Sequence, residues 1–253
     1  MSFEIALPHW RVIRHGKLPG KANMAFDAAQ LTKATERGFI PVLRFYDWRR
    51  PTITVGYGQK RDDIDFAKLD ADGIDFAVRP TGGRAVLHWD EVTYSITLPA
   101  GNEICDMSVI ESYRVLSEGL ATGFLKLGID AKLSKGEAGG HKNPSCFSST
   151  SRYEVVVNGR KLIGSAQRRK RGALLQQGSI PVGPEFRRLT DYLCAPPIST
   201  GLPEKATCVE ECLDATPSKS EIIDALIAGL RESIKFIPVE TELEQPYSAD
   251  SEN

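Results

Sequence analysis

The sequence predicts an α+β fold in a single domain, with a mixed and largely antiparallel sheet flanked by helices. Helical and strand patterns alternate irregularly along the 253 residues instead of repeating as strand–helix–strand units. The dipeptide Asn158-Gly159, a hairpin signature, stands between two runs of strand-forming residues. No internal repeat and no linker rich in Pro or Ser divides the chain. We therefore expect one domain over residues 1–237 and an acidic, flexible tail over residues 238–253.

Two helices are predicted in the first half of the chain from their ends and their apolar spacing. The alanine-rich run Met24–Arg37 precedes Gly38, a residue type that commonly follows the end of a helix. Ser108 and Glu111 are spaced as a capping box, in which each side chain binds the other's backbone N–H. Apolar residues recur at helical spacing after this box, so we expect a helix that ends at Gly128.

A third helix and the strands complete the predicted order. Ser218 and Glu221 repeat the capping-box spacing and begin a helix that we expect to be closed by Pro238. Runs rich in β-branched and aromatic residues predict the strands between the helices. The expected strands are 40–46, 52–56, 75–79, 85–88 and 93–98, followed by a meander with strands 152–157 and 160–167 that continues through residues 174 and 180.

The hairpin around Asn158-Gly159 defines its own register. A two-residue type I′ turn at this dipeptide pairs Val156 with Lys161. An ammonium group among apolar and small polar neighbours is costly unless a nearby group uses its charge, so Lys161 is a candidate functional residue. Alternation along a strand over residues 160–167 places the following residues on the same face as this lysine: Ile163, Ser165 and Gln167.

Composition and charge narrow the class of protein. The 41% of hydrophobic residues suffices for a sizeable core, and the formal net charge of −1 gives no overall attraction to nucleic acid or to membranes. No apolar window is long enough to cross a bilayer, and residues 1–20 lack the apolar centre of a signal peptide. The five cysteines form no CxxC pair, which disfavours a disulfide framework and a zinc site. We therefore expect a cytoplasmic protein that holds no metal and binds neither nucleic acid nor membrane.

Cys146 lies in a polar run of Ser and Thr just before the hairpin, with His141 and Lys142 a few residues upstream. One interpretation is a buried, inert thiol, as for most free cysteines. The other is a nucleophile: a cation such as Lys161 would favour the thiolate and lower the pKa of the thiol. The residues alone leave both interpretations open.

The segment RPTGGRAVLH at 79–88 is the second candidate site. The Gly82-Gly83 pair lets the backbone pass close to a bound group, and Arg79 and Arg84 on either side would meet an anionic or polar part of it. A tight turn alone would also require the glycines. For His88, a packed and hydrogen-bonded ring is the simpler interpretation, and a catalytic base is the alternative.

The basic run Arg168–Arg171 is expected at the tip between two strands of the meander. Solvated charge in a turn is the plainest explanation for it. A nuclear signal would require a source with a nucleus, and a docking patch for an acidic protein is the third possibility.

Taken together, these segments resemble the lipoate/octanoate protein ligase and transferase family, which is related to biotin protein ligases. The resemblance implies the fold of the biotin/lipoate ligase catalytic domain, with an acyl chain held beside the Gly-Gly turn and the strand that carries the lysine. The segments that carry it are RPTGGRAVLH at 79–88 with Tyr94-Ser95, CFSSTSRYEVVVNGRKLIGSAQRR at 146–169, LLQQGSI at 174–180 and, more weakly, NMAFD at 23–27.

Within that family the chain is closer to the octanoyltransferases that use a cysteine thioester than to the lipoate ligases that use ATP. The ligases usually carry a third glycine where this chain has Arg84, and a Gly-Asn pair in the region of residues 90–93. The Cys-Phe pair of the octanoyltransferases matches Cys146-Phe147, and their lysine matches Lys161. Two further positions depart from the family, which usually has a small or acidic residue at Trp89 and a histidine at Gln177.

The resemblance implies transfer of an octanoyl or lipoyl group from acyl carrier protein to a specific lysine of a lipoyl domain or of the glycine-cleavage H protein. Cys146 would carry the acyl group as a thioester, Lys161 would stabilise the thiolate, and no cofactor would be needed. The alternatives are an ATP-dependent lipoate ligase that acts through lipoyl-adenylate, and a non-catalytic binder of acylated carrier proteins. The expected substrate-binding residues are Arg79, Gly82, Gly83, Arg84, His88, Gly164, Ser165, Ala166 and Gln167.

Overall fold

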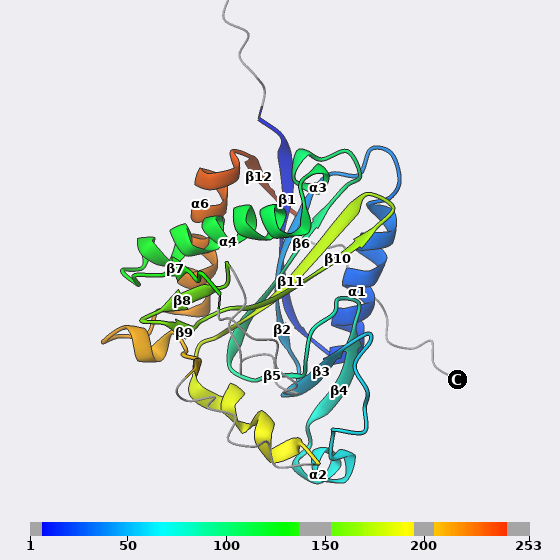
Figure 1. The fold of residues 1–253 in the computed structure, drawn as a ribbon, viewed down its shortest axis with the longest axis vertical. Helices are drawn as coiled ribbons and strands as arrows, with labels where there is room; N and C mark the ends of the chain where they lie inside the picture. The colour runs from blue at the N-terminus through cyan, green and yellow to red at the C-terminus, as the bar shows by residue number, and fades with distance from the viewer. Residues whose placement is uncertain (1–6, 137–152, 195–204, 242–253) are drawn as a thin grey trace, which may run out of the picture.

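The computed structural model describes residues 7–136, 153–194 and 205–241. Its centre is a six-stranded mixed sheet in the order β10-β11-β6-β2-β1-β12 (Figure 1). The pairs β1–β2 and β1–β12 are parallel, and the other three pairs are antiparallel. This confirms the predicted α+β class with a largely antiparallel sheet. The strands are β1 His9–Leu18, β2 Val42–Trp48, β6 Glu91–Leu98, β10 Gly164–Lys170, β11 Ala173–Pro181 and β12 Ile237–Glu240.

Two small sheets carry the sequence motifs. One has the order β4-β3-β5, with β3 at Thr52–Gly56, β4 at Asp75–Arg79 and β5 at Val86–His88, so it includes both ends of the RPTGGRAVLH segment. The other has the order β7-β8-β9 and carries Lys161. Its strands are β7 Lys132–Leu133, β8 Val155–Val157 and β9 Arg160–Lys161.

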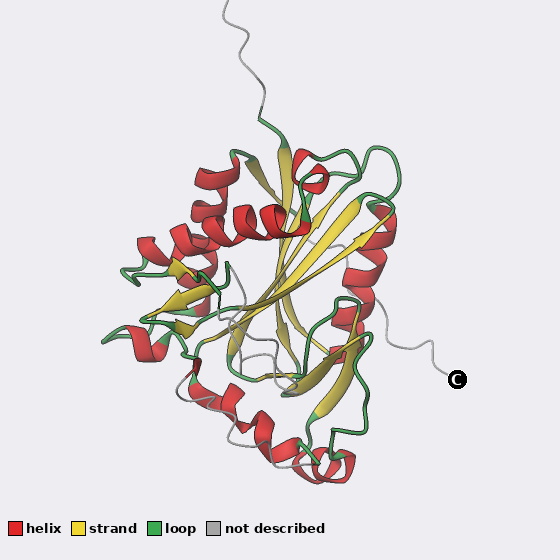
Figure 2. Cartoon of the chain, viewed as in Figure 1, coloured by secondary structure: helices red, strands yellow, loops and turns green. Residues whose placement is uncertain are grey.

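Helices cover both faces of the main sheet (Figures 1 and 2). On β11, Leu174 packs into the core formed with α4 and α6, whereas its neighbour Leu175 packs against α1. The two faces of the sheet are therefore buried by different helices, because successive side chains on a strand point to opposite sides. The helices are α1 Gly20–Lys33, α2 Phe66–Asp72, α3 Glu103–Asp106, α4 Val109–Lys126 and α6 Lys219–Ile234, with 3₁₀ segments η2 Pro184–Tyr192 and η3 Glu210–Cys212.

The sequence signals for helix starts and for the hairpin are confirmed. Both predicted capping boxes form, Ser108 with Glu111 at the start of α4 and Ser218 with Glu221 at the start of α6. In the hairpin, Asn158-Gly159 has positive φ at both residues, 50° and 76°, as a type I′ turn requires. The predicted register also holds: the partners across the turn are Val157 with Arg160 and Val156 with Lys161.

Other boundaries differ from the prediction. The first helix spans Gly20–Lys33 and not 24–37, because a turn with its own backbone hydrogen bonds follows residue 33. Strand β1, with many charged residues, is absent from the prediction, and the first strand of the hairpin is shorter than 152–157. The expected strand 160–167 is two strands in different sheets, separated by the buried Leu162 and Ile163. Alternation therefore does not continue from Lys161 to Gln167.

The C-terminal segment also differs. The last helix ends at Ile234, before Pro238 is reached, and residues 237–240 form β12, although the sequence assigns 238–240 to the flexible tail. Strand β12 lies at the edge of the sheet and pairs in parallel with β1. Proline is tolerated there because an edge strand does not need every N–H for the ladder.

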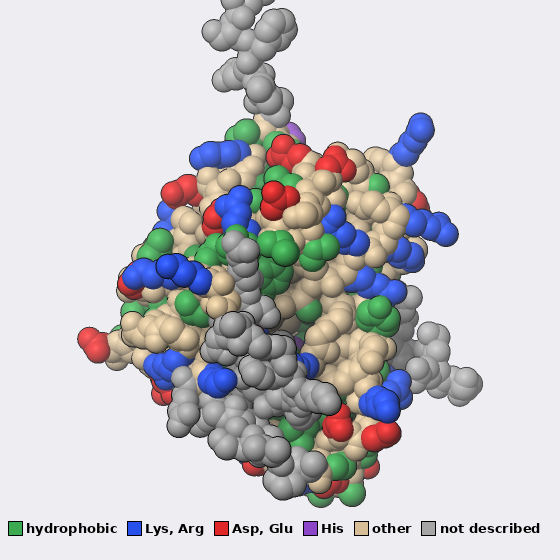
Figure 3. Space-filling model, in the orientation of Figure 1, with side chains coloured by type: hydrophobic (Ala, Val, Ile, Leu, Met, Phe, Trp, Pro, Cys, Tyr) green, Lys and Arg blue, Asp and Glu red, His purple; other side chains and the backbone are tan. Residues whose placement is uncertain are grey.

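Both basic and acidic side chains are spread over the face shown in Figure 3. This agrees with the nearly balanced charge of the chain. Within the described ranges, none of the helices combines the length and the apolar character that crossing a bilayer requires.

Helices α4 and α6 pack against each other through glycines. A Cβ atom built on Gly229 of α6 would overlap the backbone of Gly123 and lie 2.5 Å from the carbonyl oxygen of Gly119, both on α4. The close approach of the two helices therefore depends on the missing side chains at these positions.

We expect Gly229→Ala to destabilise the protein by about 1–3 kcal/mol through this overlap, although alanine favours a helix by up to about 1 kcal/mol over glycine. Chemical denaturation monitored by circular dichroism measures the change. Gly16→Ala is the control, because a Cβ atom at Gly16 meets nothing within 4 Å. Equal unfolding free energies for Gly229→Ala and the wild type would contradict the close packing.

Candidate active site: an apolar cavity backed by two buried carboxylates

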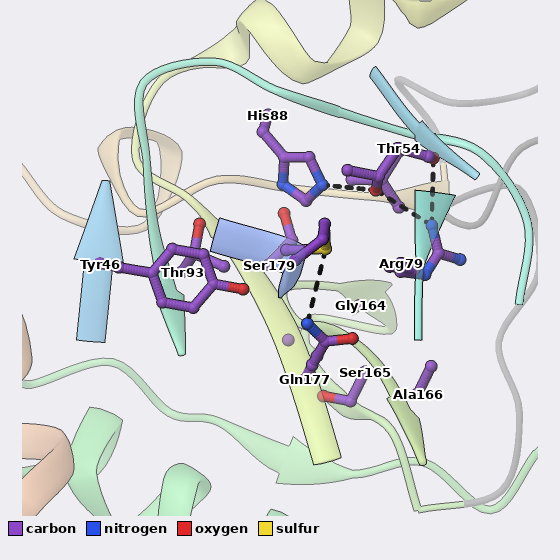
Figure 4. A pocket seen from close by; sticks show the side chains of 13 residues that line it. Tyr46, Thr54, Arg79, His88, Thr93, Gly164, Ser165, Ala166, Gln177 and Ser179 are labelled. Atoms are coloured by element: carbon purple, nitrogen blue, oxygen red, sulfur yellow. Dashed lines mark hydrogen bonds between the residues drawn. The ribbon is translucent and has the colours of Figure 1, made fainter. Parts of the chain in front are cut away.

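A cavity with about 340 Å³ of empty space lies where the main sheet meets the sheet β4-β3-β5 (Figure 4). Its walls come from segments far apart in the sequence, including α1, β2, β6, β10 and β11. The lining residues are Met24, Tyr46, Thr54, Arg79, Val86, His88, Thr93, Gly164, Ser165, Ala166, Gln177, Gly178 and Ser179. Five of the nine substrate-binding residues expected from the sequence are among them: Arg79, His88, Gly164, Ser165 and Ala166.

Arg79 holds the Gly-Gly turn beside this cavity. Its guanidinium donates hydrogen bonds to the carbonyl oxygens of Gly82 at 3.1 Å and Arg84 at 2.5 Å, and to Thr54 O at 3.0 Å. Gly83 has φ +91°, which favours glycine, and an ideal Cβ built there would lie 3.7 Å from Ala166 Cβ. The turn is therefore adjacent to the wall, although Gly82, Gly83 and Arg84 do not line the cavity.

His88 is a packed and hydrogen-bonded histidine, as its simpler interpretation predicts. Its Nε2 is 2.7 Å from Thr54 Oγ1 and its Nδ1 is 2.8 Å from Glu91 Oε1. The ring is stacked on Trp48 with 4.1 Å between centroids. Since a carboxylate only accepts hydrogen bonds, Nδ1 carries the proton. The hydroxyl of Thr54 beside Nε2 also accepts from Arg79 Nη1 at 3.1 Å (Figure 4).

Glu91 is one of two carboxylates buried behind the cavity wall, with 1% of its surface exposed. It accepts hydrogen bonds from His88, from the hydroxyl of Thr93 and from Ser179 Oγ at 2.5 Å. Burial alone would raise the pKa of Glu91, but attraction to His88 and the hydrogen bonds from His88, Ser179 and Thr93 outweigh it. The pKa of Glu91 therefore lies below its usual range, and the group is ionised at neutral pH.

Asp27 on α1 is the second carboxylate, and it is fully buried. Its Oδ1 atom accepts from Arg44 Nη1 at 2.8 Å and from Ser95 Oγ at 2.9 Å. Its Oδ2 atom accepts from Gln177 Nε2 at 2.7 Å and from the hydroxyl of Tyr46 at 3.2 Å. Asp27 thereby joins α1 to strands β2, β6 and β11 at the base of the cavity.

Gln177 extends this network to the Gly-Gly turn. While its amide nitrogen donates to Asp27, its Oε1 atom accepts a 2.8 Å hydrogen bond from the hydroxyl of Thr81, two residues before Gly83. An amide can do both at once because it carries a donor and an acceptor. Gln177, which stands where the family usually has a histidine, therefore links Asp27 to the Gly-Gly turn.

The sequence did not identify Asp27, Arg44 or Glu91 as site residues. One signal was present: Arg44 lies in the otherwise apolar and aromatic run VLRFY, and Asp27 in the weakly matching NMAFD. Charged residues are almost never fully buried unless they are paired, so a charge within a core strand indicates a partner. The partner itself is not visible in the sequence.

Lys161 is buried, with 1% exposed, and its ammonium nitrogen donates to Glu154 Oε1 at 2.6 Å. Glu154, which is also buried, thus supplies a compensating charge from the same hairpin. The pairing of Lys161 with a Cys146 thiolate is a prediction that falls outside the described residues, because Cys146 itself does so. Neither Lys161 nor Glu154 lines the cavity.

Strand β10 contributes three lining residues, Gly164, Ser165 and Ala166, next to the Gly-Gly turn. The hydroxyl of Ser165 is 2.8 Å from the hydroxyl of Tyr94 on β6, so Ser165 has a hydrogen-bond partner within the main sheet. Gln167, expected to bind substrate, instead donates to Gln176 Oε1 at 2.8 Å and accepts from Ser112 on α4 at 3.3 Å. The structure therefore places Gln167 away from the lining of the cavity.

The first three residues of the basic run Arg168–Arg171 belong to the end of β10, and only Arg171 lies in the turn to β11 where the sequence predicts the whole run. Three of its side chains contact neighbouring elements. Arg168 donates to Pro80 O at 2.8 Å, Arg169 donates to Cys105 O at 3.0 Å, and Lys170 donates to Thr32 Oγ1 at 3.2 Å. Solvated turn charge therefore describes the exposed Arg171 but not the whole run.

We expect Glu91→Gln to destabilise the protein by roughly 3 kcal/mol at neutral pH, because it breaks a buried charged network. The difference in unfolding free energy between Glu91→Gln and the wild type should become smaller as the pH falls. A carboxylate with a lowered folded pKa stabilises the protein above its unfolded pKa of about 4.3, and this contribution disappears as the pH drops through the folded pKa. Chemical denaturation between pH 7 and pH 3 measures the difference, with Glu36→Gln at an exposed position as the control. A difference independent of pH would contradict an ionised Glu91.

Comparison with known proteins finds relatives and solved structures that are similar over most of the chain. Two octanoyltransferases named LipM, from Kyrpidia tusciae and Carboxydothermus hydrogenoformans, are each 38% identical to this chain. The first match covers 95% of this chain and 93% of that protein, and the second covers 92% and 90%. The crystal structure of a lipoate-protein ligase A bound with ATP has the same fold, with a TM-score of 0.76 at 23% identity over 94% of this chain and 90% of that one. A putative lipoate protein ligase from T. acidophilum gives 0.74 at 22% identity, with the same coverage of both chains.

The family model of the lipoyl protein ligase A/B catalytic domain matches residues 19–231, a span that includes both buried carboxylates, the Gly-Gly turn and Lys161. With this match and the relatives above, the chain belongs to the lipoyl protein ligase A/B catalytic domain family.

Proposed function

We propose that this protein transfers an octanoyl group from acyl carrier protein to a specific lysine of a lipoyl domain or of the glycine-cleavage H protein, in the cytoplasm. The observation that carries the proposal is the apolar cavity beside the Gly-Gly turn, in a chain 38% identical to octanoyltransferases over more than nine-tenths of its length. Each buried CH₂ of an acyl chain contributes about 0.8 kcal/mol, so an apolar wall favours binding of a medium-length chain.

The proposed chemistry is a double displacement at Cys146. Its thiolate attacks the carbonyl carbon of the carrier thioester, and the carrier thiol leaves with its electron pair and takes up a proton. The acceptor lysine amine then attacks the acyl-enzyme thioester, which forms the amide, releases a proton and regenerates the Cys146 thiolate. The first exchange is nearly isoenergetic and the second converts a thioester into a more stable amide, so the sequence of steps needs no ATP.

Lys161 has the proposed role of stabilising the Cys146 thiolate. The contact with Glu154 at 2.6 Å supports a fixed position for the ammonium group. Cys146 precedes Glu154 by only eight residues in the chain. A cation held in this way lowers the pKa of a neighbouring thiol without having to be reoriented during the reaction.

Intact-mass spectrometry after mixing with octanoyl acyl carrier protein tests the proposal. The wild type should gain the mass of one octanoyl group, which hydroxylamine removes, whereas Cys146→Ala should gain none. Adding a lipoyl domain should move the group to that domain. An ATP-dependent ligase would instead modify the domain from free lipoate and ATP without any carrier, and a carrier-binding protein would give no adduct under either condition.

We expect Lys161→Met to raise the pKa of the Cys146 thiol by about one unit or more and to slow formation of the acyl-enzyme. The pH dependence of iodoacetamide alkylation at Cys146 measures this shift. Arg160→Gln is the matched control, since it removes the neighbouring cation, which forms a surface ion pair with Glu211 at 3.0 Å. Identical alkylation profiles for the wild type and a folded Lys161→Met protein would contradict the stabilisation of the Cys146 thiolate by Lys161.

A further inference from the structure

Most of the residues that line the cavity are polar, and their polar groups already have hydrogen-bond partners within the protein. Eight of the thirteen lining residues carry a hydroxyl, amide, imidazole or guanidinium group. All of these groups form hydrogen bonds to other residues, as described above. The surface that lines the cavity is therefore mainly carbon, although most of the lining residues are of polar types.

Two buried carboxylates collect many of these hydrogen bonds from behind the wall. Glu91 accepts from three lining residues: His88 Nδ1 at 2.8 Å, Ser179 Oγ at 2.5 Å and the hydroxyl of Thr93. It has room for them because an ionised carboxylate offers about four acceptor positions and no donor.

Asp27 does the same on the other side of the wall, where it accepts from Gln177 and Tyr46, both of which line the cavity. Arg44 balances its charge through a 2.8 Å contact and is itself fully buried. The two carboxylates thus hold the polar groups of five lining residues.

We propose that Glu91 and Asp27 are the specificity-determining residues of the acyl cavity: by holding the donors of its wall, they make it select an unsubstituted acyl chain against one that carries a hydroxyl group. The inference rests on the proposed function only for the identity of the acyl ligand. The oxygen of a hydroxyl on the chain would enter a space where the donors of these wall groups are already engaged, and a buried polar atom without a donor is costly.

Replacing Glu91 by glutamine changes this balance without changing the size of the side chain. The amide has one acceptor oxygen and adds an NH₂ group that needs acceptors of its own. The hydroxyls of Thr93 and Ser179 then lose their common anionic acceptor, and at least one of them becomes available to a ligand in the cavity. An acyl chain with a hydroxyl at a suitable carbon gains a partner, whereas the unsubstituted chain does not.

Binding of free octanoate, 6-hydroxyoctanoate and 8-hydroxyoctanoate, measured by isothermal titration calorimetry, tests the inference without requiring catalysis. For the wild type we expect octanoate to bind about 10- to 100-fold more tightly than either hydroxy acid. For Glu91→Gln we expect the ratio to fall by about tenfold for at least one of the two hydroxy acids. Adding Thr93→Val and Ser179→Ala to Glu91→Gln removes the released hydroxyls and should restore the preference.

Glu111→Gln is the control, because it weakens the exposed capping box of α4 and should leave the ratio unchanged. The inference is wrong if the ratio is the same in the wild type and in a folded Glu91→Gln protein, if Glu111→Gln lowers it equally, or if the wild type binds none of the acids. The octanoyl adduct seen by intact mass reports on the proposed function separately. If the wild type forms the adduct but Glu91→Gln leaves the affinity ratio unchanged, the proposed function stands and the proposed basis of selectivity is wrong.

Discussion

The buried ion pair between Asp27 and Arg44 is the interaction on which the site depends. The two side chains are 1% and 0% exposed, and their atoms lie 2.8 Å apart. Such a pair adds little net stability, because removing two charges from water offsets their attraction, but removing one partner costs about 3–5 kcal/mol. The pair therefore acts as a geometric constraint: α1 and β2 have to meet in one arrangement for both charges to be compensated.

That constraint reaches the Gly-Gly turn through two hydrogen bonds. Asp27 orients the amide of Gln177, and Gln177 accepts from Thr81 in the turn. Arg79 closes the same turn from its other end by donating to Gly82 O. The backbone beside the cavity is thus held from both sides, and an acyl thioester would meet a surface that does not have to reorganise, as electrostatic stabilisation of a reaction requires.

Local signals in the sequence predicted the parts of the structure that depend on near neighbours. Both capping boxes and the register at Asn158-Gly159 involve residues no more than five positions apart, and all three are confirmed. The break between β9 and β10 and the network behind the cavity depend on tertiary contacts. Glu91 and Ser179, for example, are 88 residues apart in the chain, and no periodicity relates them. The sequence therefore located five of the thirteen lining residues but not the charges behind them.

Lys161 shows why a buried charge is weak evidence for one particular partner. Its burial on β9 indicated an anion nearby, and a cysteine thiolate was a reasonable choice, yet Glu154 in the same hairpin already meets the requirement at 2.6 Å. This does not remove the case for a catalytic lysine. A carboxylate neighbour favours the charged form of an amine that burial would otherwise disfavour. The ion pair with Glu154 therefore fixes the position of the ammonium group in the hairpin, and its action on the Cys146 thiolate stays a prediction.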